Sequence, residues 1–135
     1  MKAEGILETV LYADRLQEMR HFYERIIGLD VVQAAPDRHL FFRCGNQMLL
    51  VFDPRLTRVQ DGGDVPPPHG ASGPGHVCFR AATLGVERWR EHLVRHGIAI
   101  ETDFAWPRGG RSIYFRDPAG NSVEIAEPGI WGLGP

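Results

Sequence analysis

The sequence predicts an α+β fold in which two βαβββ modules form one curved mixed sheet, a half-open cup with the helices on its outer face. Short β-branched and aromatic runs alternate with single segments of helical periodicity. The order of one strand, one helix and three further extended runs occurs twice. Landmarks in the two copies keep a nearly constant separation, from Glu8 to His76 and from Gly28 to Gly97. Such a spacing indicates an internal repeat.

The first module is expected to span residues 5–54. A strand at 6–12 precedes a helix that Asp14 is expected to cap, and apolar residues recur at helical spacing from Leu16 to Ile27. Gly28 is expected to end the helix, and extended structure resumes at 29–32. Two further strands are predicted at 40–43 and 48–52, joined by a turn at Gly45 and Asn46.

The second module is expected to span residues 75–128 within a single domain of residues 1–135. It has a strand at 76–79, a helix that ends at Gly97, an extended run at 98–101, and a hairpin of strands 112–115 and 122–126. Residues 55–74 form the connecting loop, and a loop of this length serves as a linker or as a lid over a site. The apolar tail, residues 129–135, is expected to pack on the body of the protein or on a second subunit.

Composition and charge exclude several classes of function. The formal net charge is −2, which does not favour nucleic acid or an anionic membrane as a partner. No apolar run reaches the roughly 18 residues that a membrane span requires, and the first residues have no signal-peptide character. Cys44 and Cys78 do not form a disulfide framework. We therefore expect a cytoplasmic protein.

Three polar side chains interrupt otherwise apolar strands, namely Glu8, His76 and Glu124. Strand side chains alternate between two faces, so one polar residue in an apolar strand marks a face with a special role. If a pseudo-twofold axis relates the repeats, Glu8 and His76 occupy equivalent positions and face each other. Two carboxylates in one cleft need a compensating cation, and a divalent metal supplies it. The sequence therefore predicts a metal site of one imidazole and two carboxylates.

The chain resembles the vicinal oxygen chelate superfamily over roughly residues 6–128. That superfamily includes glyoxalase I, methylmalonyl-CoA epimerase, fosfomycin-resistance enzymes, extradiol dioxygenases and bleomycin-resistance binding proteins. The resemblance is carried by residues 22–29, by GHVCF at 75–79 and most specifically by FRDPAGNSVE at 115–124. It implies a glyoxalase-like fold, a divalent metal on the concave face, a substrate that chelates the metal through neighbouring oxygens, and a homodimer.

The resemblance assigns metal ligation to His76 and Glu124, and Glu8 stands where many members have histidine. Glu8 is expected to be a third ligand, with a general base or half of an ion pair as the alternatives. The metal would be Mn²⁺, Fe²⁺, Zn²⁺ or Ni²⁺. Leu49 or Leu50 stands where glyoxalase I has a further ligand or base, which argues against a standard glyoxalase I. Glu8 also departs from the two-histidine, one-carboxylate triad of extradiol dioxygenases.

Five further residues are candidates for substrate contact or catalysis. Trp106 and Arg108 flank a glycine pair and could bind a planar anion, or they could belong to a solvated hairpin connection. Tyr114 is expected to orient the substrate. Cys78 could touch substrate or act as a small hydrophobic residue, and His69 could close over the site or remain a solvated loop residue.

The expected function is that of a metal-dependent lyase or isomerase, with the metal stabilising negative charge on a substrate oxygen and Glu8 or Glu124 moving a proton. Two alternatives remain open. One is a ring-cleaving dioxygenase with non-haem iron, and the other is a metal-free binding protein of the bleomycin-resistance type.

Overall fold

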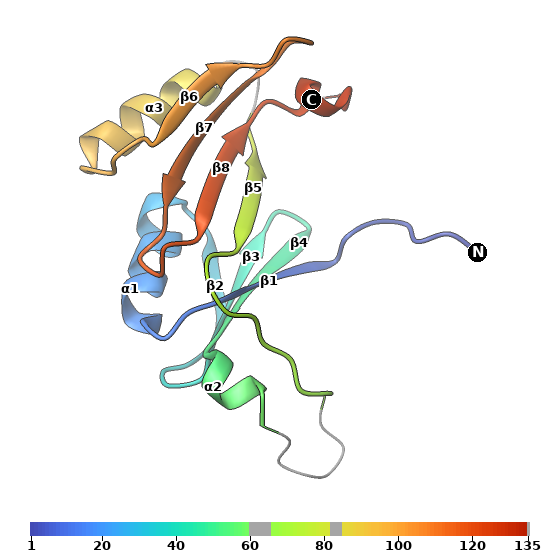
Figure 1. Ribbon diagram of the computed structural model, residues 1–135, viewed down its shortest axis with the longest axis vertical. Helices are drawn as coiled ribbons and strands as arrows, with labels where there is room; N and C mark the ends of the chain where they lie inside the picture. Colours follow the sequence, from blue (N-terminus) through green and yellow to red (C-terminus); the bar gives the residue numbers. More distant parts are fainter. Residues whose placement is uncertain (60–65, 82–84, 135) are drawn as a thin grey trace. The chain divides into compact units, whose positions relative to one another are not determined.

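The computed structural model describes residues 1–59, 66–81 and 85–134. The chain divides into two compact units, Met1–Gly75 and His76–Pro135, and each is described by itself. Each unit contains a four-stranded sheet, and Figure 1 shows helices beside each sheet. Among the described residues, no helix is both long enough and apolar enough to cross a membrane.

The first unit contains a mixed sheet in the order β1-β4-β3-β2. Its strands are β1 (Glu8–Tyr12), β2 (Asp30–Ala35), β3 (His39–Cys44) and β4 (Gln47–Phe52). The β1 strand runs parallel to β4, whereas the β2–β3 and β3–β4 pairs are antiparallel. The helices are α1 (Leu16–His21), the π-helical segment η1 (Phe22–Ile26) and the short α2 (Pro54–Thr57).

The first helix differs from the prediction at its start and agrees at its end. It begins at Leu16 after Arg15, with no side-chain cap, so the expected capping by Asp14 is wrong. The helix then continues as a π-helix, in which the amide of Ile27 donates to the carbonyl of Phe22, five residues earlier. Gly28 ends it with φ +83°, a backbone conformation that favours glycine.

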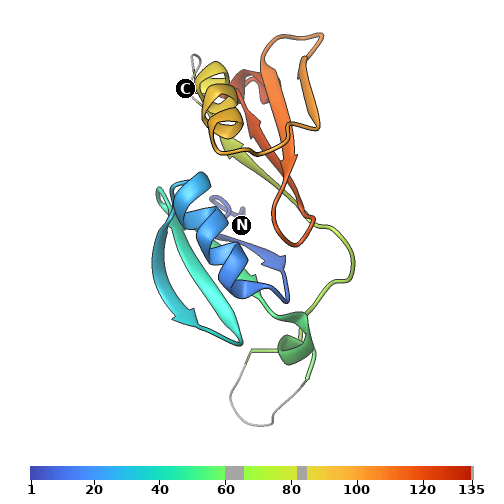
Figure 2. The ribbon, with the colours of Figure 1, turned by 90° about the vertical axis from the view of Figure 1, so that its left-hand side faces the viewer.

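The second unit repeats this topology. Its strands are β5 (His76–Arg80), β6 (Thr102–Ala105), β7 (Arg111–Arg116) and β8 (Ser122–Ala126), in the order β5-β8-β7-β6. Its helices are α3 (Gly85–Arg95) and the 3₁₀ helix η2 (Pro128–Trp131). Figure 2 shows α1 and α3 each lying along one face of the sheet in its own unit. The predicted α+β fold of two βαβββ modules is confirmed, and each module forms an open four-stranded mixed sheet of its own rather than a share of one sheet.

The β6 strand lies later in the sequence than the extended run that was predicted before β7. The extended run at 98–101 is not a strand, because the amide of Ile98 donates to the carbonyl of Leu93 and closes the end of α3. Pairing with β7 starts at Glu101, whose amide donates to the carbonyl of Tyr114 over 2.7 Å. The strand therefore comprises Thr102–Ala105 and contributes Phe104 to the sheet.

Alternation along β7 and β8 separates a core face from an open face in the second unit. The α3 helix packs against these two strands. Four side chains of the core face are fully buried, namely Ile113, Phe115, Val123 and Ile125. The register places Cys78, Glu124 and Tyr114 side by side on the opposite face. We call this second surface the open face, and among the residues that the sequence singled out it carries Cys78, Tyr114 and Glu124.

The turn before β8 is fixed by the carboxylate of Asp117, which is 4% exposed. Its Oδ1 accepts from the amides of Ala119 and Asn121, over 3.0 Å and 2.9 Å, and its Oδ2 accepts from Nδ2 of Asn121 over 2.8 Å. An Asx-type turn of this kind sets where the following strand starts. The most specific sequence motif is thus structural for most of its length, and it delivers Glu124 to the open face.

Candidate metal and substrate site

His76 and Glu124 are in contact on the open face. Nε2 of His76 lies 3.3 Å from Oε2 of Glu124. Half of the His76 side chain is exposed, whereas the Glu124 side chain is 7% exposed. His76 is the first residue of β5, which runs parallel to β8. The register pairs His76 with Ser122 and Glu124 with Cys78, so His76 and Glu124 are diagonal neighbours on one face of the sheet.

The other nitrogen of the His76 ring fixes the role of Nε2. Nδ1 lies 3.1 Å from the carbonyl oxygen of Ser122, and a carbonyl only accepts, so Nδ1 carries the hydrogen. In the neutral ring, Nε2 then presents a lone pair to the carboxylate of Glu124. Two lone pairs at this distance repel each other unless a proton or a cation lies between them. Orientation of a histidine through its second nitrogen is typical of metal ligands.

Glu124 is a buried carboxylate with an unsatisfied oxygen. Its Oε1 is shielded from solvent and has no hydrogen-bond partner in the described part of the chain. An unpaired buried acceptor costs about 1–3 kcal/mol, and more when it is charged. Two ligands that are each about 2.1 Å from one ion stand about 3.0–3.4 Å apart at octahedral or tetrahedral angles. The separation of Nε2 and Oε2 fits that requirement, so this pair suits a divalent cation.

Two neighbouring groups respond to the Glu124 carboxylate. Desolvation raises the pKa of the Tyr114 phenol to about 12, and hydrogen bonding to Glu124 adds to the rise. Desolvation likewise raises the pKa of the Cys78 thiol to about 12, with a further contribution from the charge of Glu124. Both groups therefore keep their protons at neutral pH. Tyr114 is available as a hydrogen-bond donor, and Cys78 is not a thiolate nucleophile.

A row of four rings crosses the open face from the His76–Glu124 pair. The ring centroids of His76 and Tyr114 are 6.3 Å apart with the rings nearly parallel. The Tyr114 and Phe104 centroids are 6.2 Å apart at an interplanar angle of 10°. Phe104 then lies 4.7 Å from Trp106. These contacts connect the His76–Glu124 pair to the β6–β7 turn through side chains alone.

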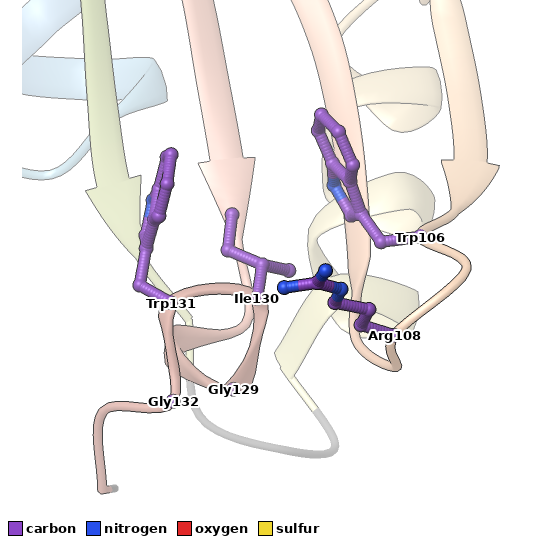
Figure 3. A pocket seen from close by; sticks show the side chains of 6 residues that line it. All are labelled: Trp106, Arg108, Gly129, Ile130, Trp131 and Gly132. Carbon is purple, nitrogen blue, oxygen red and sulfur yellow. The ribbon is translucent and has the colours of Figure 1, made fainter.

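At the end of this row lies a pocket of about 560 Å³, shown in Figure 3. It is formed by the β6–β7 turn on one side and the η2 helix on the other. Its lining comprises Trp106, Arg108, Gly129, Ile130, Trp131 and Gly132. Trp106 and Arg108, which the sequence suggested as substrate-binding residues, thus line one cavity.

Glu8 occupies the first position of β1 in the first unit, and its side chain is exposed. It pairs with Met48 as His76 pairs with Ser122, so the two residues hold equivalent register positions. The same comparison makes Leu50, rather than Leu49, the counterpart of Glu124. Within the described ranges, no three or more His, Cys, Asp or Glu side chains are grouped so that they could hold a metal ion.

His69 lies in the first unit, where it belongs to an aromatic cluster. Its Nδ1 lies 2.7 Å from the hydroxyl of Tyr12, and its ring meets Phe52 edge-on at a centroid distance of 5.0 Å. Its amide donates to the carbonyl of Thr57 over 2.9 Å. The residue is therefore fixed on the sheet of the first unit, and a contact with substrate remains a prediction.

Four residues that contribute to the second unit's site were not assigned a role in it by the sequence prediction. The carbonyl of Ser122 orients His76, and a backbone group leaves no mark in the sequence. Phe104 was missed because β6 was placed too early, and correct placement would have put it on the open face with Tyr114. Ile130 and Trp131 belong to the apolar tail that was expected to pack on the body of the protein or on a second subunit. The sequence did not indicate that they would lie beside the β6–β7 turn.

The fold defines a class, that of proteins with two βαβββ modules in one chain. The sequence profile of the glyoxalase/bleomycin resistance protein/dioxygenase superfamily matches residues 5–125. The chain belongs to this superfamily, as the motifs predicted. A comparison with curated proteins found no match.

Solved structures agree with this assignment. A structure described as lactoylglutathione lyase from Agrobacterium tumefaciens is 42% identical, with a TM-score of 0.95 and coverage of 98% of this chain and 100% of the other. A glyoxalase/bleomycin resistance protein/dioxygenase from Nocardioides gives a TM-score of 0.73 at 22% identity, covering 99% of this chain and 92% of the other. A glyoxalase family protein from Bacillus anthracis gives 0.70 at 22% identity, covering 94% and 97%. The last two show the fold alone.

Proposed function

We propose that the protein is a metal-dependent, glyoxalase-like lyase or isomerase that acts on a small oxygenated molecule. One observation carries the proposal. Nε2 of His76 lies 3.3 Å from Oε2 of Glu124, while Nδ1 of the same ring is committed to the backbone carbonyl of Ser122. A divalent cation would bind to both atoms when the ring is neutral and would also supply a partner for the unsatisfied oxygen of Glu124.

His76 and Glu124 would hold the ion, and Glu8 is the proposed third ligand. The exposed carboxylate of Glu8 has no hydrogen bond or ion pair in the described part of the chain, so it is available for this role. Mn²⁺, Fe²⁺, Zn²⁺ and Ni²⁺ all accept such nitrogen and oxygen ligands. When bound, the ion supplies Lewis-acid stabilisation of negative charge on a substrate oxygen.

The chain's own groups would orient the substrate and move the proton. Tyr114 keeps its phenolic hydrogen and can donate it to a substrate oxygen, which positions the reacting carbon. Glu124 or Glu8 is the proposed proton acceptor, since a carboxylate within reach of an acidified C–H group can act as a general base. Cys78 contributes packing beside Glu124 rather than nucleophilic chemistry.

The relative from Agrobacterium tumefaciens makes lactoylglutathione the first substrate to test. At 42% identity over 98% of the chain it supports lyase chemistry. The apolar Leu50 at the position equivalent to Glu124 leaves one fewer polar group than a standard glyoxalase I requires, so a different oxygenated substrate is the competing expectation. We further propose a cytoplasmic homodimer, in keeping with the paired modules of this superfamily.

Metal content tests the proposal directly. Protein stripped with a chelator and reloaded with each of the four metals should retain about one ion per chain by elemental analysis. His76→Ala and Glu124→Gln should lose it, whereas His96→Ala, which removes an exposed imidazole on the same unit, should not. The proposal would be contradicted if none of the four ions were retained by the protein or raised its stability.

The row of four rings favours one second candidate, a metal-free binding protein. Stacked aromatic side chains bind flat ligands without any chemistry. Under this alternative, Glu8→Gln and Glu124→Gln should keep full ligand affinity. Oxygen consumption with catechols after anaerobic loading with Fe²⁺ would instead identify a ring-cleaving dioxygenase.

A further inference from the structure

The pocket between the β6–β7 turn and the η2 helix has features that the proposed metal chemistry does not use. We propose that it binds the flat, negatively charged part of the ligand, an aromatic or conjugated carboxylate. The inference deepens the proposed function by naming a substrate class. It rests on that function only for the claim that the ligand's remaining oxygens meet His76 and Glu124.

The pocket is built by specific contacts between its two walls. The amide of Arg111 donates to Oε2 of Glu127 over 2.9 Å, and the amide of Glu127 donates to the carbonyl of Arg111 over 3.0 Å. A Cβ added to Gly110 would lie 2.6 Å from Cγ2 of Ile130 and 3.2 Å from its backbone nitrogen. The turn and the helix therefore touch at a residue without a side chain, and the cavity lies beside this contact.

The charge of the pocket favours an anion. Arg108 makes no hydrogen bond or ion pair with the described residues, and its guanidinium reaches into the space beside Ile130 (Figure 3). The nearby carboxylates are already engaged, because Arg90 and Arg111 bind Asp103 and the amide of Arg111 binds Glu127. A guanidinium fork without a partner matches a carboxylate, which it can bind through two parallel hydrogen bonds.

The shape of the pocket favours a flat ligand. The indole rings of Trp106 and Trp131 flank it on opposite sides, with Ile130 between them (Figure 3). The Trp106 ring is held in place, because its Nε1 donates to Oγ of Ser112 over 2.8 Å. A volume of about 560 Å³ lies within the usual range for small-molecule sites and accommodates two fused rings.

The ring row joins this pocket to the proposed metal ligands. Trp106 contacts Phe104, Phe104 stacks with Tyr114, and Tyr114 stacks with His76. A conjugated molecule anchored at Arg108 would therefore lie along an aromatic surface that leads to the histidine–carboxylate pair. This continuity distinguishes the pocket from an isolated surface hollow.

Fluorine NMR can test the pocket without metal or turnover. The chain has three tryptophans, so 5-fluorotryptophan labelling gives one reporter on α3, at Trp89, and two in the pocket, at Trp106 and Trp131. Metal-stripped protein is titrated with 2-naphthoate. The expected result is a saturable shift of the two pocket signals with the Trp89 signal unchanged. Binding of 2-naphthalenemethanol and cyclohexanecarboxylate should be weaker, because one lacks the charge and the other the flat ring.

Variants separate the charge from the shape. Arg108→Gln should weaken 2-naphthoate binding by roughly tenfold or more, the worth of a charge-assisted hydrogen bond, and Arg108→Lys should weaken it less. Arg88→Gln, which removes an exposed arginine of α3, is the matched control and should have no effect. Trp131→Ala should also weaken binding.

Two results would overturn the inference. One is that Arg108→Gln binds 2-naphthoate as tightly as the unchanged protein does, and the other is that only the fluorine signal of Trp89 shifts in the titration. Because the titration uses metal-free protein, failure of the metal proposal would leave its outcome unchanged. Conversely, a protein that binds one ion at His76 and Glu124 but does not bind 2-naphthoate would refute the pocket assignment alone.

Discussion

Replacing Glu124 with glutamine is expected to change the stability of the protein in opposite directions with and without metal. The carboxylate is 7% exposed, one of its oxygens has no partner among the described residues, and the other lies 3.3 Å from Nε2 of His76. These are unfavourable surroundings for a charge and favourable ones for a ligand. The substitution keeps the shape of the side chain and removes the charge.

The magnitudes follow from burial and from binding. An unsatisfied buried carboxylate costs more than the ~1–3 kcal/mol of a neutral acceptor, so the neutral amide should raise the free energy of unfolding by about 1 kcal/mol in metal-free protein. An ion at a hundred times its dissociation constant adds about 2.7 kcal/mol to a protein that binds it. If the variant binds no ion, the unchanged protein should therefore be more stable than Glu124→Gln by roughly 1.7 kcal/mol with metal, which is 2.7 less 1 kcal/mol.

Thermal unfolding at pH 8.5, with chelator and then with each of the four metals, measures both differences. In a chain of this size 1 kcal/mol corresponds to a shift of about 4 °C in Tm. Glu91→Gln, an exposed carboxylate on α3, is the matched control and should not change the order. A Glu124→Gln variant that is less stable in chelator, or an unchanged protein that gains no stability from any metal, would refute this reasoning.

Three further predictions follow from the same unit. Gly110→Ala should lower stability by about 1–2 kcal/mol, because the residue has φ +86° and its Cβ would overlap Ile130, and it should abolish 2-naphthoate binding in the NMR titration. Asp117→Ala should cost about 3 kcal/mol in urea unfolding, because three donors of the turn lose their acceptor, whereas Asp117→Asn should cost less. Alkylation of Cys78 at pH 8, followed by mass spectrometry, should be at least about a hundredfold slower than that of a free thiol and should recover on unfolding, because a pKa raised to about 12 leaves little thiolate.

The repeat made most of the fold predictable. Two copies of one pattern of strands and helix were visible because the apolar periodicity and the glycines that end the helices recur at nearly constant spacing. Local backbone details were not predictable in the same way. The helix start at Leu16 without a side-chain cap and the widened turn after His21 depend on how the helix packs on its sheet, and neither follows from residue preferences.

The candidate site was predictable where alternation along a strand determines which face a side chain occupies. His76 and Glu124 could be placed on one face, where the register makes them diagonal neighbours and their side chains are in contact. The backbone carbonyl that orients His76 carries no sequence signal. The pocket could not be predicted, because it depends on a long-range contact between the C-terminal tail and the β6–β7 turn. Gly110 leaves room for this contact, but a glycine in the sequence does not predict it.

The proposed function depends most on whether a divalent ion lies between His76 and Glu124. A crystal structure of protein soaked in Mn²⁺, with anomalous scattering recorded, measures this directly. The proposal predicts one strong anomalous peak within bonding distance of Nε2 of His76 and the Glu124 carboxylate, with Nδ1 still bonded to the carbonyl of Ser122. A fully loaded crystal with its manganese elsewhere, and with the two side chains still in direct contact, would contradict it.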